Sequence, residues 1–191
     1  MISETQFIDV FRVARHDWMN QLQLIKANLA LNRLDRIDAI IDKIVKEAQS
    51  ESHLSNLRAP KLASLLLLQK NTTNAIILHI NVPPLSLDLS GLDDQITANL
   101  ETLFNAIQAS SGADQSIRVE LAVTKFEEMV LGLELIMTTK GLNLSAFRES
   151  VSSLENWTFE TTKITLLSEP EAEGIRLSVV FPLAEAENRT P

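Results

Sequence analysis

Apolar residues recur at helical spacing near the start of the chain. Residues 3–31 contain no glycine or proline, and their pattern predicts about eight helical turns, roughly 40 Å long. Ser3 followed by Gln6 resembles a capping box at the start of this helix. The main apolar positions fall on one narrow stripe when each residue advances the helix by about 100°. This apolar seam consists of Phe11, Trp18, Leu22, Ile25 and Leu29.

A second helix follows after a short connection. Residues 32–35 predict a turn, with Asp35 as the N-cap of a helix over residues 36–54. This helix has a stripe of its own, at Ile37, Ile40, Ile41, Ile44, Ala48 and Ser52. The short connection makes the pair an antiparallel hairpin. Because two helices have too little mutual surface to bury both stripes, we expect either a second hairpin or another domain to cover them. Four helices in a homodimer is the economical solution.

The pattern changes at Pro60, where we place a domain boundary. The hairpin takes residues 1–58, and a second domain takes residues 59–191. In that domain the pattern predicts helices at 61–70 and 93–110, a helix or loop at 143–154, and strands at 75–82, 116–123, 129–137, 158–167 and 174–181. Helices followed by mostly adjacent strands indicate an α+β domain with its helices on one face of the sheet.

Composition narrows the classes of function. The 17 basic and 25 acidic residues give a net charge of −8, and the basic residues are scattered, which argues against nucleic-acid binding. No apolar run reaches the ~18 residues that a membrane span needs, and the N-terminus lacks a secretion signal. The absence of cysteine excludes disulfides and thiol chemistry. We expect a cytoplasmic protein with protein partners.

The candidate chemistry lies at His16. This residue is two positions before Trp18, so it projects about 200° away from the seam, on a polar face shared with Asp9, Asn20 and Gln23. An exposed neutral imidazole has a free lone pair, which can attack an activated phosphoryl group and form a phosphoramidate.

The neighbours of His16 suit that chemistry. Asp17 could orient one ring nitrogen or accept its proton, and Asn20 lies one helical turn further on. Arg12 and Arg15 lie within one turn before the histidine and could hold phosphate oxygens.

Without those neighbours, an exposed helical histidine is most often an ordinary surface residue. The other two histidines support no site. His53 lies near a predicted helix end, where a cation suits the helix dipole, and His79 lies in a predicted strand among apolar neighbours. The three positions do not have metal-ligand spacing.

The sequence Arg15-His16-Asp17-Trp18-Met19-Asn20, its continuation to Ile25, and residues 51–57 resemble the phosphoacceptor hairpin of the sporulation initiation phosphotransferase B family. The same core also resembles the dimerisation hairpin of citrate-type sensor histidine kinases. The resemblance covers roughly residues 12–57.

The family resemblance implies a phosphorelay protein. His16 would take a phosphoryl group from the aspartyl-phosphate of one response regulator. It would then pass the group to the aspartate of a second regulator, a transcription factor that controls sporulation. The resemblance also implies a homodimer, no intrinsic cofactor, and Mg²⁺ supplied by the receiver domain of the response regulator.

The second domain resembles the ATP-binding domain of histidine kinases. Residues 100–109 are similar to its asparagine box, with Asn105 at the magnesium-binding position, and residues 174–182 are similar to its closing strand. Thr139 replaces the expected aspartate, and Asn143 replaces a glycine. No glycine lies between Asn143 and Thr158, although a lid that folds its backbone around a triphosphate needs glycines there. The resemblance therefore implies a degenerate α/β sandwich that does not bind nucleotide.

Two other functions remain open at this point. The chain could be the core of an ATP-dependent sensor histidine kinase, which would need the missing glycine lid. It could also be a non-enzymatic dimerisation scaffold, in which His16 has no chemical role.

Overall fold

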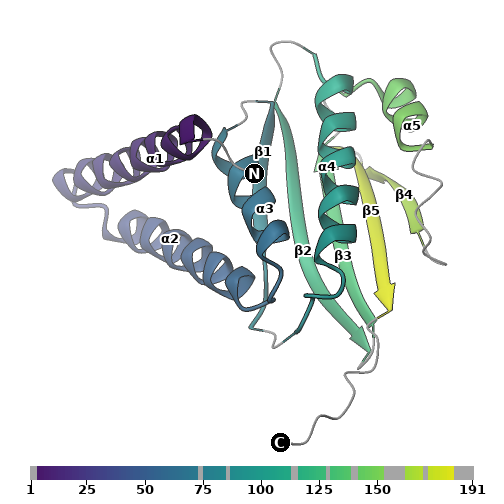
Figure 1. Ribbon diagram of the computed structural model, residues 1–191. Coiled ribbons are helices and arrows are strands. Elements are labelled where there is room, and N and C mark those ends of the chain that lie inside the picture. Colours follow the sequence, from purple (N-terminus) through teal and green to yellow (C-terminus); the bar gives the residue numbers. More distant parts are fainter. Residues whose placement is uncertain are drawn as a thin grey trace, which may run out of the picture.

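The computed structural model describes residues 4–72, 75–84, 87–112, 116–127, 130–138, 142–152, 162–169 and 172–182. A helical hairpin is followed by a sheet with helices packed on it (Figure 1). This architecture confirms the predicted α+β class with an N-terminal helical part.

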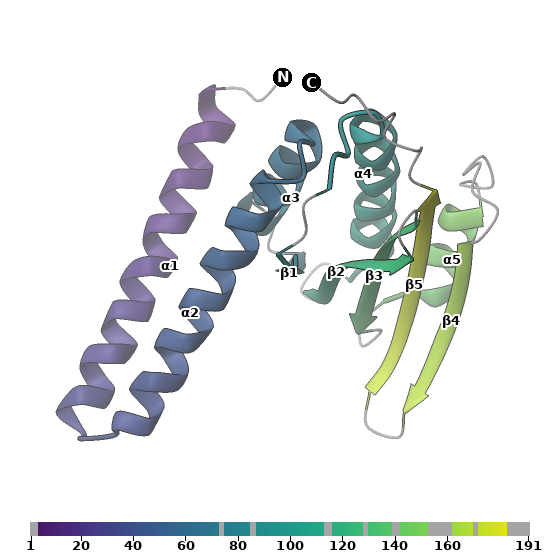
Figure 2. The ribbon, with the colours of Figure 1, turned by 90° about the horizontal axis from the view of Figure 1, so that it is seen from below.

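Two long antiparallel helices form the hairpin (Figure 2). They are α1 (Glu4–Ala30) and α2 (Leu34–Ser55). The turn closes when the Arg33 N–H donates to the Asn28 carbonyl at 2.9 Å, with Asn32 in the left-handed region at φ 52°. The prediction of Asp35 as N-cap is wrong. Because the left-handed Asn32 closes the turn early, α2 begins at Leu34, and Asp35 already lies in its first turn.

One sheet of five strands forms within the described residues, in the order β1-β2-β3-β5-β4. Its strands are β1 (Ile76–Asn81), β2 (Ile117–Glu127), β3 (Val130–Thr138), β4 (Thr162–Glu169) and β5 (Ala172–Pro182). Strands β1 and β2 are parallel, and the other neighbours are antiparallel. The helices α3 (Pro60–Thr72), α4 (Asp93–Ser110) and α5 (Leu144–Ser152) complete this part.

The core lies between the sheet and its helices. Side chains of β2 alternate, so Val119 and Leu121 are buried while Arg118 and Glu120 are exposed. Helix α4 contributes a buried stripe made of Ile96, Leu100, Leu103, Phe104 and Ile107. Burying such side chains stabilises the fold by about 25 cal/mol per Å² of apolar surface.

The predicted elements match the structure closely. The helix over residues 93–110 is confirmed at both ends, and the region at 143–154 is a helix over part of its length. Strand β2 extends four positions beyond the predicted end at residue 123. The predicted start of the strand at 158–161 lies outside the described residues, as does Ser3 of the predicted capping box.

Several contacts hold the C-terminal end of α2 near the sheet. The ring Nδ1 of His53 lies 2.8 Å from the Val82 carbonyl oxygen, so this nitrogen carries a proton and donates it. Next to α2, Arg58 has a positive φ of 51° and pairs with Asp88 at 3.1 Å. Hydrogen bonds from Ser90, and the nearby Arg58 guanidinium, lower the pKa of Asp88 below its ordinary value.

A buried carboxylate caps α3 from a distant part of the chain. The Asp93 side chain accepts the backbone N–H of Lys61 at 3.0 Å and that of Leu62 at 2.8 Å. These amides belong to the first turn of α3, where the backbone N–H groups have no acceptor within the helix.

The predicted boundary at residues 58 and 59 falls between α2 and α3, and the division into two domains stays a prediction.

Candidate functional site

His16 projects from the middle of α1 into solvent. Its side chain is 72% exposed, as its position opposite the apolar seam predicts. The Asn20 amide nitrogen lies 3.1 Å from the ring Nδ1, one helical turn away on the same face. One ring nitrogen therefore has a side-chain partner, and no described side chain makes a hydrogen bond to Nε2.

Asp17 does not make the hydrogen bond to a ring nitrogen of His16 that the sequence suggested. Its Oδ1 is 3.6 Å from the His16 Nδ1, which is too long for a hydrogen bond but close enough for electrostatic attraction. The next residue along a helix is turned by about 100°, so Asp17 faces away from the His16 face. It lines a cavity next to α3 instead.

The two arginines are less closely connected to His16. Arg12 forms an ion pair with Asp9, one turn earlier on α1. Arg15 is exposed. Among the described residues, no hydrogen bond or ion pair links either arginine to His16. The structure therefore brings together His16, Asn20 and, more loosely, Asp17, while both guanidinium groups stay near but apart from the ring.

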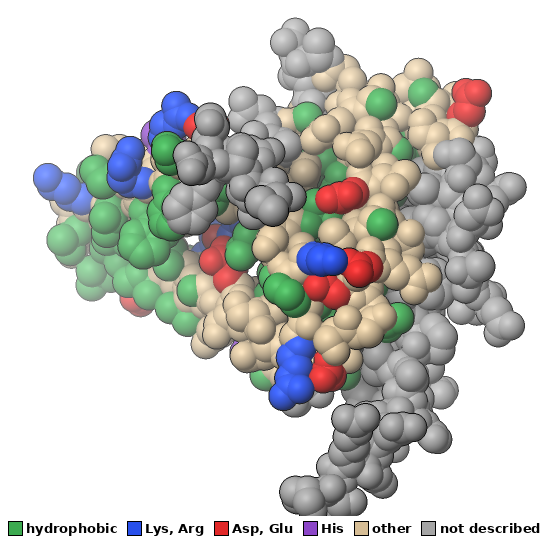
Figure 3. Space-filling view, viewed as in Figure 1, with side chains coloured by type: hydrophobic (Ala, Val, Ile, Leu, Met, Phe, Trp, Pro, Cys, Tyr) green, Lys and Arg blue, Asp and Glu red, His purple; other side chains and the backbone are tan. Residues whose placement is uncertain are grey.

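A broad apolar face of the hairpin is uncovered in the single chain (Figure 3). Phe11 is 60% exposed, Trp18 72% and Leu22 59%. On α2, Ile41 and Val45 are also exposed. Exposed apolar surface of this kind marks an interaction site. The face lies on the opposite side of α1 from His16, so covering it would leave the imidazole accessible.

Two of the positions compared with the ATP-binding domain of histidine kinases lie among the described residues. Asn105 is exposed on α4. The Asn143 side-chain oxygen accepts the Ala146 N–H at 3.2 Å, which is a helix cap at the start of α5. This bond gives a structural reason for the asparagine. Thr139 lies outside the described residues.

In the part of the chain that the structure describes, no group of three or more histidine, aspartate or glutamate side chains could hold a metal ion. No helix there is long and apolar enough to cross a membrane.

Sequence reasoning missed a set of residues close to this site. Lys43 and Glu47 of α2 and Lys70 and Asn71 of α3 line a cavity together with Asp17. These residues are far apart in the sequence, and no motif or spacing connects them. They meet only because α3 lies next to the hairpin.

Comparison with known proteins finds a family model that matches the hairpin and a curated relative of part of the chain. Residues 2–57 match the family model described as "Sensor_kinase_SpoOB-type, alpha-helical domain". The chain is 39% identical over 100 residues to sporulation initiation phosphotransferase B of Bacillus subtilis (strain 168). This match covers 52% of the chain and 52% of the relative. The chain thus spans about half the length of the curated relative that it matches.

Solved structures give weaker similarities. The blue-light activated histidine kinase of Erythrobacter litoralis EL346 is 14% identical with a TM-score of 0.40, covering 97% of this chain and 65% of that chain. The mycobacterial sensor histidine kinase MprB is 16% identical with a TM-score of 0.38, covering 64% and 92% respectively. The family model and the curated relative confirm the predicted resemblance to sporulation initiation phosphotransferase B, which the SpoOB-type helical match places in the hairpin.

Proposed function

We propose that this chain is a phosphorelay phosphotransferase in which His16 carries the phosphoryl group. The group arrives from the aspartyl-phosphate of one response regulator and leaves to the aspartate of a second regulator that controls sporulation. The similarity to sporulation initiation phosphotransferase B supports a phosphorelay role. The observation that carries the residue assignment is an imidazole that is 72% exposed and held at one nitrogen by Asn20.

The transfer step needs one free ring nitrogen. The Nε2 lone pair attacks phosphorus, a P–N bond forms, and the P–O bond to the aspartyl carboxylate breaks with its electrons staying on that carboxylate. For a neutral ring this requires the proton on Nδ1. As placed, the Asn20 amide nitrogen would donate to Nδ1, which leaves the ring proton on Nε2. With the amide turned over, its oxygen would accept a proton on Nδ1 and leave Nε2 free, so in that orientation Asn20 selects the reactive tautomer.

Charge near the ring would stabilise the phosphorylated state. A phosphohistidine with a proton on Nδ1 carries positive charge on its ring, and the Asp17 carboxylate at 3.6 Å favours that charge. Arg15 would hold phosphate oxygens. Arg12 could do the same after exchanging Asp9 for phosphate.

The partners follow from the two surfaces of α1. The uncovered apolar face would pair with a second copy of the chain to give a four-helix bundle. The receiver domain would dock on the His16 face, where the 52% exposed Met19 provides an apolar contact. Ala14, one turn before Trp18, would extend that contact to the edge of the bundle. The receiver would supply Mg²⁺ with its own acidic residues, so the chain would need no cofactor of its own.

Transfer of label between two receivers tests this function. One receiver domain is phosphorylated with ³²P and mixed with a second, unlabelled receiver in the presence or absence of the protein. The native protein and the Gln23→Ala variant, which changes the same polar face, should pass the label on. The His16→Gln variant should not, with unchanged helicity by circular dichroism. Transfer at the native rate by His16→Gln would refute the proposal.

A further inference from the structure

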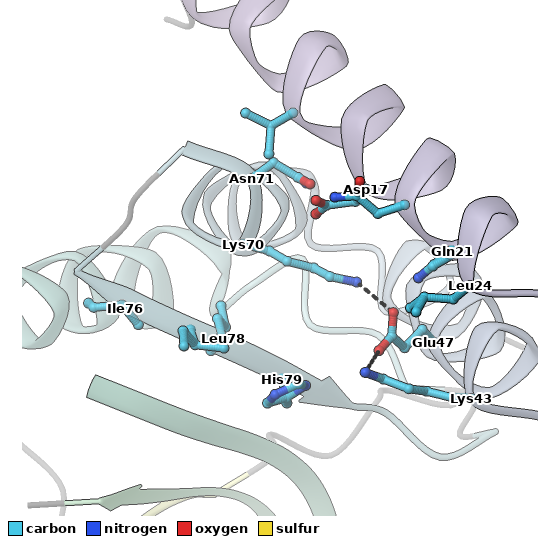
Figure 4. A pocket seen from close by; sticks show the side chains of 13 residues that line it. Asp17, Gln21, Leu24, Lys43, Glu47, Lys70, Asn71, Ile76, Leu78 and His79 are labelled. Atoms are coloured by element: carbon cyan, nitrogen blue, oxygen red, sulfur yellow. Dashed lines mark ion pairs between the residues drawn. The ribbon is translucent and has the colours of Figure 1, made fainter. Parts of the chain in front are cut away.

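Helix α3 packs against the stretch of α1 that carries His16. A cavity of about 450 Å³ lies beside this contact, with α2 and strand β1 completing its wall (Figure 4). The lining side chains of α1 recur at helical spacing, at Val13, Asp17, Asn20, Gln21 and Leu24. Because this set includes both neighbours of the imidazole ring, Asp17 and Asn20, the segment that presents His16 is also the segment that faces α3.

Lys70 joins the C-terminal end of α3 to α2. It lies in the last turn of α3, four residues after the buried Leu66 and therefore on the same face of the helix. Its side chain is only 24% exposed. The ammonium group lies 2.8 Å from a carboxylate oxygen of Glu51 and 3.7 Å from one of Glu47, and Figure 4 shows the pair with Glu47. One cation thus links α3 to two consecutive turns of α2.

The two glutamates of α2 depend on this ammonium group. They lie one helical turn apart on one face, so their negative charges repel each other. Glu47 has a second basic partner, Lys43 at 3.8 Å. Among the described residues, Lys70 is the one base within ion-pair distance of Glu51. Because the ammonium group is largely shielded from solvent, salt screens these pairs less than it screens exposed ones. Removing the charge of Lys70 would leave Glu51 without a cation and release the end of α3.

Helix α1 needs such support more than α2 does. The C-terminal end of α2 is anchored in the core of the sheet and its helices, where Leu54 and Leu57 are buried. In contrast, none of the side chains of α1 that the structure describes is buried. Within the single chain, α1 is therefore held by the hairpin turn and by its packing against α2 and α3. A helix with so little buried surface opens locally more easily than one anchored in a core.

We propose that Lys70 is a positioning residue for phosphotransfer. Its ion pairs hold the end of α3 in place, and α3 holds the segment of α1 over residues 13–24 that presents His16. An imidazole on a loosely held helix meets the phosphoryl group in the reactive orientation less often, so the rate of transfer depends on this support. The inference rests on the proposed function of His16. It gives the sheet and its helices a part in the reaction that needs no nucleotide.

Hydrogen exchange and transfer rate, measured on the same variants of the full chain, test the proposal. Lys70→Met removes the charge and keeps the aliphatic stem. It should speed amide exchange of residues 13–24 about three- to ten-fold and slow ³²P transfer from a labelled receiver by a similar factor. Lys70→Arg keeps the charge and should restore both values. Lys61→Met removes another ion pair of α3, the one with Asp94 of α4, and should leave both values native.

Three results would overturn the proposal. Equal exchange of residues 13–24 in Lys70→Met and Lys61→Met would show that Lys70 does not hold α1. Exchange that also speeds up throughout α4 in Lys70→Met would indicate a general loss of stability. Transfer at the native rate despite faster exchange in α1 would show that His16 does not need this support. Failure of the proposed function is a separate result, because it would appear in the native protein as the absence of phosphate on His16.

Discussion

At the scale of single residues, the account depends on the pairing of His16 with Asn20. The helix brings these two side chains together, because residues four positions apart lie on the same face. The 3.1 Å contact to Nδ1 means that the Asn20 amide influences which ring nitrogen carries the proton. We propose that Asp17 acts through charge instead, since its oxygen is 3.6 Å away.

Replacing Asn20 by alanine should slow phosphoryl transfer without unfolding the chain. Loss of one exposed hydrogen bond that favours the reactive tautomer should lower the rate about 3- to 10-fold. The rate at which ³²P leaves a labelled receiver measures this effect. The ¹⁵N shifts of the His16 ring should move toward the mixture of tautomers found in free histidine. Native tautomer populations in Asn20→Ala would contradict the assigned role.

Single residues also show what could and what could not be predicted from the sequence. The exposure of His16 follows from local helical periodicity, so it was predicted. The direction of Asp17 follows from the same periodicity, but the cavity that it lines depends on where α3 lies relative to α1. That placement involves residues about fifty positions away, so the cavity was not predicted. The Asp35 cap was wrong because the conformation of one turn residue, Asn32, moved the helix start.

At the scale of elements, the hairpin turn relies on a residue with positive φ. Asn32 adopts φ 52°, which asparagine and glycine tolerate better than other residues. Asn32→Ala should lower the free energy of unfolding by about 1 kcal/mol, and Asn32→Gly should leave it nearly unchanged. Urea denaturation followed by circular dichroism measures both. Equal stability of the alanine and glycine variants would show that the turn takes another conformation in solution.

The apolar seam of α1 should hold two copies of the chain together. Leu22 is 59% exposed in the single chain, so in a four-helix bundle it would be buried against the partner. Leu22→Glu should convert the dimer to a monomer in sedimentation analysis because it would bury an unpaired charge. Gln23→Glu adds the same charge on the His16 face and should stay dimeric. A monomeric native protein would refute the bundle.

At the scale of the whole molecule, the main question is whether the sheet and its helices bind a nucleotide. Periodicity predicted most elements of this part, including α4 to the residue, because their apolar faces are regular. The cavity beside β1 could not be predicted, since it depends on how the hairpin and the sheet meet. The departures at Thr139 and Asn143 and the absence of glycine between Asn143 and Thr158 predict that the sandwich does not hold ATP.

Calorimetry with ATP and Mg²⁺ checks that prediction. No heat of binding is expected up to millimolar nucleotide, because the chain lacks a glycine-rich lid for the triphosphate. Stoichiometric, magnesium-dependent binding would instead favour a sensor kinase core. An Asn105→Ala variant that lost such binding would locate it.

Mass mapping of the phosphorylated residue tests the central claim most directly. The protein is incubated with a phosphorylated receiver, digested at alkaline pH where phosphohistidine survives, and analysed by tandem mass spectrometry. The account predicts phosphate on the His16 ring, in a form that acid removes. Phosphate on His53, His79 or a hydroxyl side chain, with His16 unmodified, would contradict it.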